Sequence, residues 1–129
     1  MDERRVPEAT DADAISAAAR QVSLTISAAS VIIFSLTGST TLRTARERPT
    51  VPIIGLTSRL DIARRMALVW GVHSVQTEDC QSFREMVDTA LRVACDEGFA
   101  STGDTVVITA GVPFGTPGAT NILRIAKVE

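Results

Sequence analysis

The sequence contains few of the residues that build metal centres and nucleophilic active sites. Its two cysteines, Cys80 and Cys95, form no CxxC pattern, and His73 is the only histidine. A structural zinc site needs about four such ligands, and a catalytic triad needs a base together with a group that orients it. We therefore expect no metal site and no triad. We interpret His73 as structural and both cysteines as reduced thiols.

Long apolar runs and a marked excess of one charge are also missing. No apolar run approaches the roughly 18 residues of a membrane span, and the charged residues 1–7 contain no signal-peptide core. The net charge is −2, so nothing in the composition favours nucleic acid or anionic lipid. These absences predict a cytoplasmic protein with no nucleic-acid or membrane partner.

The residues that are present make a globular composition. The chain has 129 residues, 45% of them hydrophobic and 22% charged, which suits one domain with its own core. The single tryptophan, Trp70, is expected to pack in that core. We expect residues 1–12 to be a polar leader and residues 13–129 to be the domain.

Apolar spacing alternates between helical and extended patterns along the domain. Helices are predicted at residues 13–29, 39–48, 59–69 and from 83 to about 97, and strands at residues 31–34, 52–57, 72–75, 105–109 and 121–126. Strands that alternate with helices favour a parallel sheet covered on both faces.

The end of the chain breaks this alternation. Only a loop separates the last two predicted strands, and a parallel crossover needs about a dozen or more residues, usually with a helix. We therefore expect the last strand to run antiparallel at a sheet edge. With the first strand in the centre, the predicted order is 3-2-1-4-5. The predicted fold class is α/β, a three-layer α/β/α sandwich around a five-stranded mixed sheet.

Two loops are expected to meet where this sheet reverses its winding, at the carboxyl ends of the first and fourth strands. Ligands of open α/β sheets bind at such a point. The first loop, residues 35–41, opens a helix, whose N–H groups and dipole favour anions. Its glycine lets the backbone wrap and its hydroxyl groups add donors, so the candidate phosphate-binding residues are Ser35, Thr37, Gly38, Ser39 and Thr40.

Residue types alone leave the role of this first loop open. The same hydroxyl groups and glycine could simply cap the helix and form the turn. Three arginines on the following predicted helix, Arg43, Arg46 and Arg48, would add positive charge. The second loop could close over a ligand, although a plain hairpin connection is its simpler local interpretation; its glycines are Gly111, Gly115 and Gly118.

Three segments carry a more specific pattern. They read VVITAGVPFGTPGATN at residues 106–121, RPTVPIIGLT at residues 48–57 and RRMALVWGV at residues 64–72. In this order and spacing they resemble the carboxyl-terminal regulatory domain of bacterial pyruvate kinases. The resemblance extends from about residue 13 to the end of the sequence, and it implies an α/β sandwich with a five-stranded mixed sheet.

The resemblance also implies a function. The complete enzyme transfers phosphate from phosphoenolpyruvate to ADP, using Mg²⁺ and usually K⁺, on a barrel of roughly 250 residues. These 129 residues cannot contain that barrel, so the chain is expected to be non-catalytic alone and to hold no cofactor of its own. In relatives, the loop matching residues 35–40 binds an effector phosphate, and residues 111–118 match a second effector loop.

The chain departs from one branch of the family. Some relatives activated by fructose bisphosphate carry basic residues at the positions of Leu36 and Ser39, with a Trp and an Arg beyond the third strand. Only Arg84 is available in that stretch. The expected effector is therefore a sugar phosphate, AMP or plain phosphate, and a homo-oligomer is expected. The alternative is a structural subunit-interface domain without a ligand.

Overall fold

A computed structural model describes residues 11–47, 50–78, 80–110 and 122–129. Most of the expected leader, at residues 1–10, lies outside these ranges. Helices and strands alternate as predicted: α1 (Asp11–Thr25), β1 (Ser30–Phe34), α2 (Ser39–Arg46), β2 (Ile53–Thr57), α3 (Leu60–Met66), β3 (Val72–Gln76), α4 (Phe83–Asp96), β4 (Thr105–Ala110) and β5 (Ile122–Lys127).

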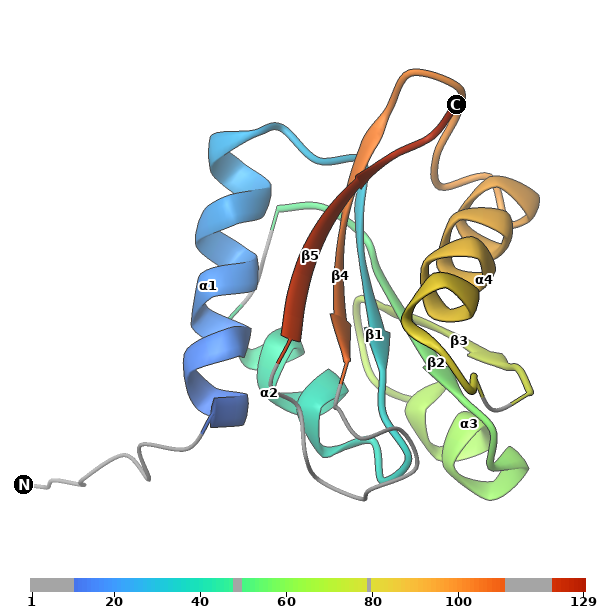
Figure 1. Cartoon of the computed structure of the whole chain (residues 1–129). Coiled ribbons are helices and arrows are strands. Elements are labelled where there is room, and N and C mark those ends of the chain that lie inside the picture. Colours follow the sequence, from blue (N-terminus) through green and yellow to red (C-terminus); the bar gives the residue numbers. More distant parts are fainter. Residues whose placement is uncertain (1–10, 48–49, 79, 111–121) are drawn as a thin grey trace, which may run out of the picture.

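The five strands form one mixed sheet in the order β3-β2-β1-β4-β5. Strand β1 pairs in parallel with β2 on one side and with β4 on the other, and β2 pairs in parallel with β3. Strand β5 runs antiparallel to β4 at the edge (Figure 1). The predicted fold class, strand order and antiparallel last strand are confirmed.

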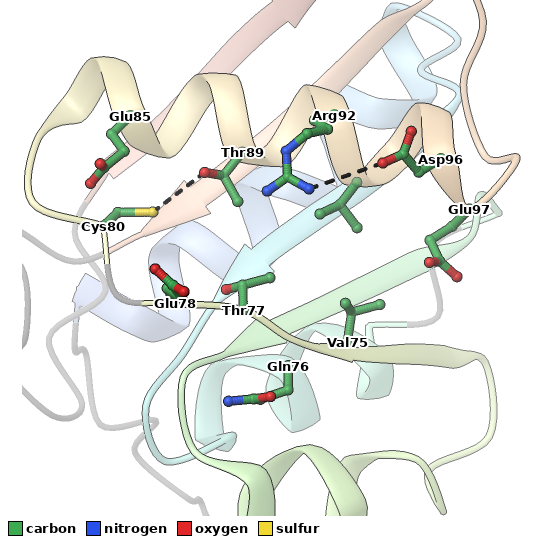
Figure 2. Close-up of a pocket in the computed structure, with 11 residues that line it drawn as sticks. Val75, Gln76, Thr77, Glu78, Cys80, Glu85, Thr89, Arg92, Asp96 and Glu97 are labelled. Atoms are coloured by element: carbon green, nitrogen blue, oxygen red, sulfur yellow. Dashed lines mark hydrogen bonds and ion pairs between the residues drawn. The ribbon is translucent and has the colours of Figure 1, made fainter.

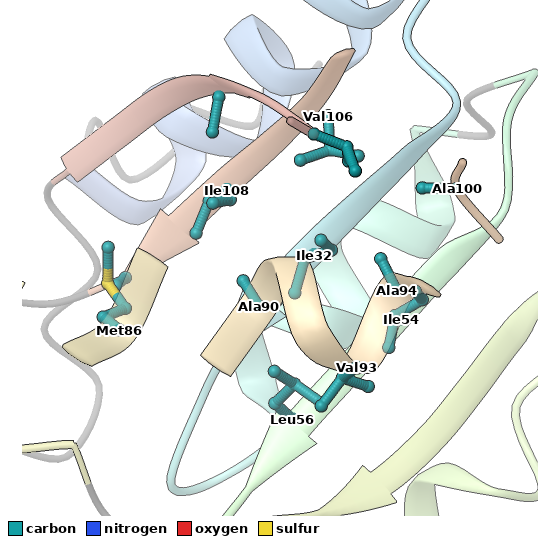
Figure 3. Close-up of a cluster of buried hydrophobic side chains, with 13 residues drawn as sticks. Ile32, Ile54, Leu56, Met86, Ala90, Val93, Ala94, Ala100, Val106 and Ile108 are labelled. Carbon is teal, nitrogen blue, oxygen red and sulfur yellow. The ribbon is translucent and has the colours of Figure 1, made fainter. Parts of the chain in front are cut away.

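Strand β1 forms the centre of two hydrophobic cores, one on each face of the sheet. Ile32 faces α4 and packs with Ile54, Val106 and Ile108, as Figure 3 shows. Val31 and Ile33 face the opposite way and pack with Ala19 of α1. The side chains of Val31, Ile32 and Ile33 are all fully buried. A strand that is apolar on both faces therefore has to occupy the middle of the sheet.

Helix α4 covers one face of the sheet, and α1 lies on the opposite face (Figure 1). Helices α2 and α3 share the α1 side. Ser74 of β3 donates a hydrogen bond to the carbonyl oxygen of Ala63 in α3 at 2.6 Å, and Ser74 has the same orientation in β3 as Val72, which packs against the α1 core. Among the described residues, no helix is long and apolar enough to span a bilayer.

Helix α1 ends earlier than its apolar spacing predicts. The expected end near Ala29 is wrong, and the helix stops at Thr25. Ser27 adopts a left-handed φ of 53°, which breaks the helical path. The amide of Ala29 then donates to the carbonyl oxygen of Thr105 at 2.8 Å, so the backbone already pairs with the start of β4 at this residue.

Trp70 is not in the core, which corrects the sequence-based expectation. Helix α3 stops at Met66, and the amides of Leu68 and Val69 close its end by bonding to the carbonyl oxygens of Arg65 and Met66. The turn that follows leaves Trp70 91% exposed and Leu68 87% exposed.

Truncating a side chain at the centre of the sheet should be costly. We expect Ile32→Ala to lower the free energy of unfolding by about 2–5 kcal/mol, because it removes buried surface and leaves a cavity. The control Leu68→Ala, at an exposed leucine, should change it by less than about 0.5 kcal/mol. Urea unfolding followed by circular dichroism measures both, and equal effects would contradict the central position of Ile32.

Candidate functional site

The candidate site lies where β1 and β4 end side by side. Ile33 of β1 is in register with Thr109 of β4, so the two strands finish at the same edge of the sheet. Residues 35–38 leave β1 there, and the amide of Ser35 still bonds to Leu56 of β2 at 3.0 Å. The described part of β4 ends at Ala110. The second-loop candidates lie outside the described residues; they are Gly111, Gly115 and Gly118.

The hydroxyl groups of the first loop bind its own backbone. The Ser35 hydroxyl oxygen accepts from the amide of Gly38 at 2.8 Å. The Thr37 hydroxyl oxygen accepts from the amide of Ser39 at 3.3 Å, and the hydroxyl groups of Thr37 and Ser39 lie 3.0 Å apart. Ser35 and Thr37 thus stabilise the turn that leads into α2, by accepting from the amides of its N-cap residue Gly38 and its first residue Ser39.

These bonds leave the loop able to donate to an anion. A hydroxyl group that accepts from an N–H group still carries a proton of its own. Thr37 is exposed, and Ser35 and Ser39 are half-buried. Either hydroxyl group of the Thr37–Ser39 pair can donate to the other. The group that accepts keeps its own proton, which points away from the pair and can be donated to a ligand. The loop therefore combines a hydrogen-bonded backbone with hydroxyl donors at the positive end of the α2 dipole.

Gly38 and Thr40 are buried within this loop. Gly38 caps α2 with φ 82° and ψ −4°, a left-handed conformation that favours glycine. Its carbonyl oxygen accepts the first helical bond from the amide of Leu42. Thr40 is 1% exposed, so its side chain belongs to the interior beneath the loop. Of the five candidates, Thr37 is therefore the exposed one, Ser35 and Ser39 are half-buried, and Gly38 and Thr40 lie in the interior.

The arginines of α2 lie away from its first turn. Arg43 and Arg46 belong to the last turn of the helix, where cations complement the negative end of the dipole. At 1.5 Å rise per residue, they are about 6 and 10 Å further along the helix axis than Ser39. Arg48 lies outside the described residues. The electrostatics at the start of α2 therefore depend on its amides, hydroxyl groups and dipole.

A separate groove, which the sequence did not indicate, runs between β3 and α4 (Figure 2). It has a volume of about 510 Å³. Among the described residues that line it, Arg92 is the only basic one, and it lies 4.0 Å from Asp96. The amide of Gln81 donates to Glu85 at 2.5 Å, as part of the capping of α4. The carboxylates of Glu78, Glu85, Asp96 and Glu97 line the groove. Their negative charge does not favour a phosphate in it.

The side chains near this groove that could have suggested chemistry have structural contacts. His73 Nε2 lies 2.6 Å from Glu97 Oε1, and its ring centroid lies 5.0 Å from that of Phe99. Ser82 caps α4 by accepting from the amide of Glu85. The capping pair Ser82 and Glu85 was readable as a Ser-x-x-Glu motif. Within the described ranges, no three His, Cys, Asp or Glu residues could share a metal ion, and the cysteines form no disulfide.

Comparisons with known proteins agree with the α/β fold. Residues 13–126 match the family model described as "Pyruvate kinase, alpha/beta domain". A pyruvate kinase of Methylorubrum extorquens is 47% identical over 128 residues, covering 99% of this chain and 27% of that protein. One of Geobacillus stearothermophilus is 37% identical over 122 residues, covering 95% and 21%. The chain thus spans about a quarter of the length of these relatives.

The hydrogen bond from the Gly38 amide to the Ser35 hydroxyl oxygen should contribute to stability without any ligand. We expect Ser35→Ala to lower the free energy of unfolding by about 0.5–1.5 kcal/mol, because the partly buried Gly38 amide loses its acceptor. Thr102→Ala, in an exposed turn, serves as the control and should change it by less than about 0.5 kcal/mol. Urea unfolding of both variants tests this, and an unchanged Ser35→Ala variant would refute the bond.

Proposed function

This chain belongs to the pyruvate kinase alpha/beta domain family, and from that premise we propose that it binds the phosphate group of a small effector at residues 35–40. In this proposal it is the allosteric, subunit-contact domain of a cytoplasmic pyruvate kinase. The longer protein would transfer phosphate from phosphoenolpyruvate to ADP in glycolysis, and this domain would regulate that reaction without catalysing it.

One observation carries the proposal. A loop rich in hydroxyl groups joins the central strand to the N-terminus of α2, at the point where the sheet reverses its winding. Strand β4 ends beside it, immediately before the glycine-rich residues 111–118. Helix N-termini at such reversal points suit oxyanions, because their amides and dipole complement negative charge.

The chemistry of the loop favours a single phosphate group. Residues 35–40 contain no cationic side chain. The arginines in the last turn of α2 lie between about one and two helical turns beyond the start of the helix. Affinity would thus come from O–H and N–H donors that surround one group, rather than from widely spaced cations that could hold two. A sugar monophosphate, AMP or inorganic phosphate fits this arrangement better than a bisphosphate.

The exposed Thr37 provides a test of phosphate binding. Titration with inorganic phosphate, and separately with AMP, should shift the amide resonances of Ser39 and Thr40. Thr37→Asp should weaken binding by roughly tenfold or more, because a carboxylate would face the anion at short distance. Thr40 is unsuitable for this substitution because it is buried. Two-dimensional NMR spectra recorded at rising ligand concentration give the dissociation constants.

Thr37→Asn is the matched control for this experiment. Asparagine has nearly the size of aspartate and also caps helices well, but it carries no charge. It should bind phosphate more tightly than Thr37→Asp, and both variants should fold. Wild-type resonances that stay unchanged at millimolar phosphate and AMP, or equal affinities of the two variants, would count against phosphate binding at this loop.

A second candidate function, a subunit interface without a ligand, is favoured by the exposed strand β5. This strand is the sheet edge next to β4, and its Ile125 is 48% exposed. An edge strand can pair with its copy across a two-fold axis. In this alternative, the loop at residues 35–40 would serve only to cap α2.

Sedimentation velocity over a range of protein concentrations tests this interface. A β5-mediated dimer should dissociate on dilution, and Ile125→Lys should weaken it, because a charged side chain would replace an exposed apolar one on the pairing strand. Leu68→Lys, at an exposed leucine in the turn after α3, is the control. A strictly monomeric wild-type chain at high concentration, or equal dimerisation of Ile125→Lys, would contradict a β5 interface.

A further inference from the structure

We infer that Met66 of α3 is a positioning residue for the phosphate-binding loop, because its side chain packs directly over Gly38 and fixes the backbone from which the donors project. The inference rests on the proposed function. It assigns a binding role to a residue outside the loop, in a helix that supplies none of the candidate donors.

The contact is visible in the space around Gly38. A Cβ atom added to Gly38 would lie 3.0 Å from Met66 Sδ, 3.1 Å from Met66 Cε and 3.3 Å from Ile62 Cγ2. Such distances are shorter than ordinary van der Waals contact, so the methionine side chain occupies the space that any other residue at position 38 would need. Gly38 is itself buried, and Met66 is only 3% exposed.

Helix α3 holds Met66 in a fixed place. Its buried residues Ile62, Ala63 and Met66 form one apolar stripe. The hydroxyl group of Ser74 in β3 bonds to the carbonyl oxygen of Ala63 at 2.6 Å, which ties the middle of the helix to the sheet. Met66 is the last residue of the helix, and its own carbonyl oxygen accepts from the amide of Val69. The loop thus rests on an element anchored to the sheet.

This packing matters for binding because the donors depend on the conformation of Gly38. The amide of Gly38 bonds to Ser35, and the next amide, of Ser39, bonds to Thr37. A rotation of the backbone at Gly38 would break this pattern and move the hydroxyl groups of Thr37 and Ser39. A loop held in its binding conformation loses less entropy when an anion binds. Removing the Met66 side chain should therefore weaken binding without removing any donor.

The test compares two buried methionines on opposite faces of the sheet. Met66→Ala should raise the dissociation constant for inorganic phosphate on the order of tenfold, which corresponds to about 1.4 kcal/mol. Met66→Leu conserves most of the volume and should restore binding to near the wild-type value. Met86→Ala, in the α4 core and fully buried, should lower the unfolding midpoint but leave the dissociation constant unchanged.

A second variant covers the case in which Met66→Ala does not fold. Met66→Val removes Sδ and Cε but keeps a branched apolar side chain, so it should weaken phosphate binding in the same direction with a smaller loss of stability. Circular dichroism and the unfolding midpoint identify folded variants. The dissociation constants come from NMR titration with inorganic phosphate.

A pair of glycine substitutions tests the contact itself. Gly38 and Gly98 both have φ 82°, but nothing lies within 4 Å of an added Cβ at Gly98. Gly38→Ala should therefore lower the unfolding midpoint more than Gly98→Ala, which adds backbone strain alone. In a chain that already carries Gly38→Ala, Met66→Ala should lower the unfolding midpoint less than it does in the wild-type chain. The reason is that removing the Met66 side chain relieves its clash with the added Cβ atom.

The outcomes separate this inference from the proposed function. If the wild-type chain binds phosphate and Met66→Ala or Met66→Val binds it equally well, the positioning role is overturned and the proposed function stands. If the wild-type chain binds no phosphate, both fail. If Met86→Ala weakens binding as much as Met66→Ala, the effect is one of general stability, and the inference is again overturned.

Discussion

The parallel pairing of β1 with both β2 and β4 is the constraint on which the rest of this structure depends. Val31, Ile32 and Ile33 are fully buried and face both sides of the sheet. This strand cannot occupy an edge without exposing one of its two apolar faces. Its central position sets the reversal of winding, and the reversal brings the end of β4 beside the loop that opens α2.

The hydroxyl groups at residues 35–40 already have a structural use, and the proposed binding of an anion would use the same groups. Ser35 and Thr37 accept from the amides of Gly38 and Ser39, so their oxygen lone pairs stabilise the start of α2. Their protons are separate groups and can serve a ligand. The bonds to the backbone therefore do not conflict with the proposed binding of an anion, because they use the oxygen lone pairs and leave the protons.

Much of the fold could be predicted because its causes are local in the sequence. The apolar run of β1 and the short link before β5 were enough to predict the strand order and the antiparallel edge. The end of α1 was missed because the segment around Ser27 is rich in alanine and serine, and nothing in it signals a left-handed φ. Trp70 was misplaced because aromatic character favours burial, while the early end of α3 turns this residue outward.

The candidate site was predictable in its composition but not in its packing. Residue types indicated which groups could bind a phosphate, and the strand order indicated where they would meet. The burial of Thr40 and the proximity of Met66 to Gly38 depend on how the elements pack in three dimensions. That arrangement joins residues almost thirty positions apart, and neither segment alone carries a signal for it.

A crystal structure of the chain grown with millimolar AMP would show where the phosphate group binds. The account predicts the phosphate within hydrogen-bond distance of the Thr37 and Ser39 hydroxyl groups, at the start of α2. A separate groove of about 530 Å³ lies between α4 and β5, and Arg92, Arg124 and Lys127 line it together with Glu129. A phosphate bound there, with residues 35–40 unoccupied, would contradict the account.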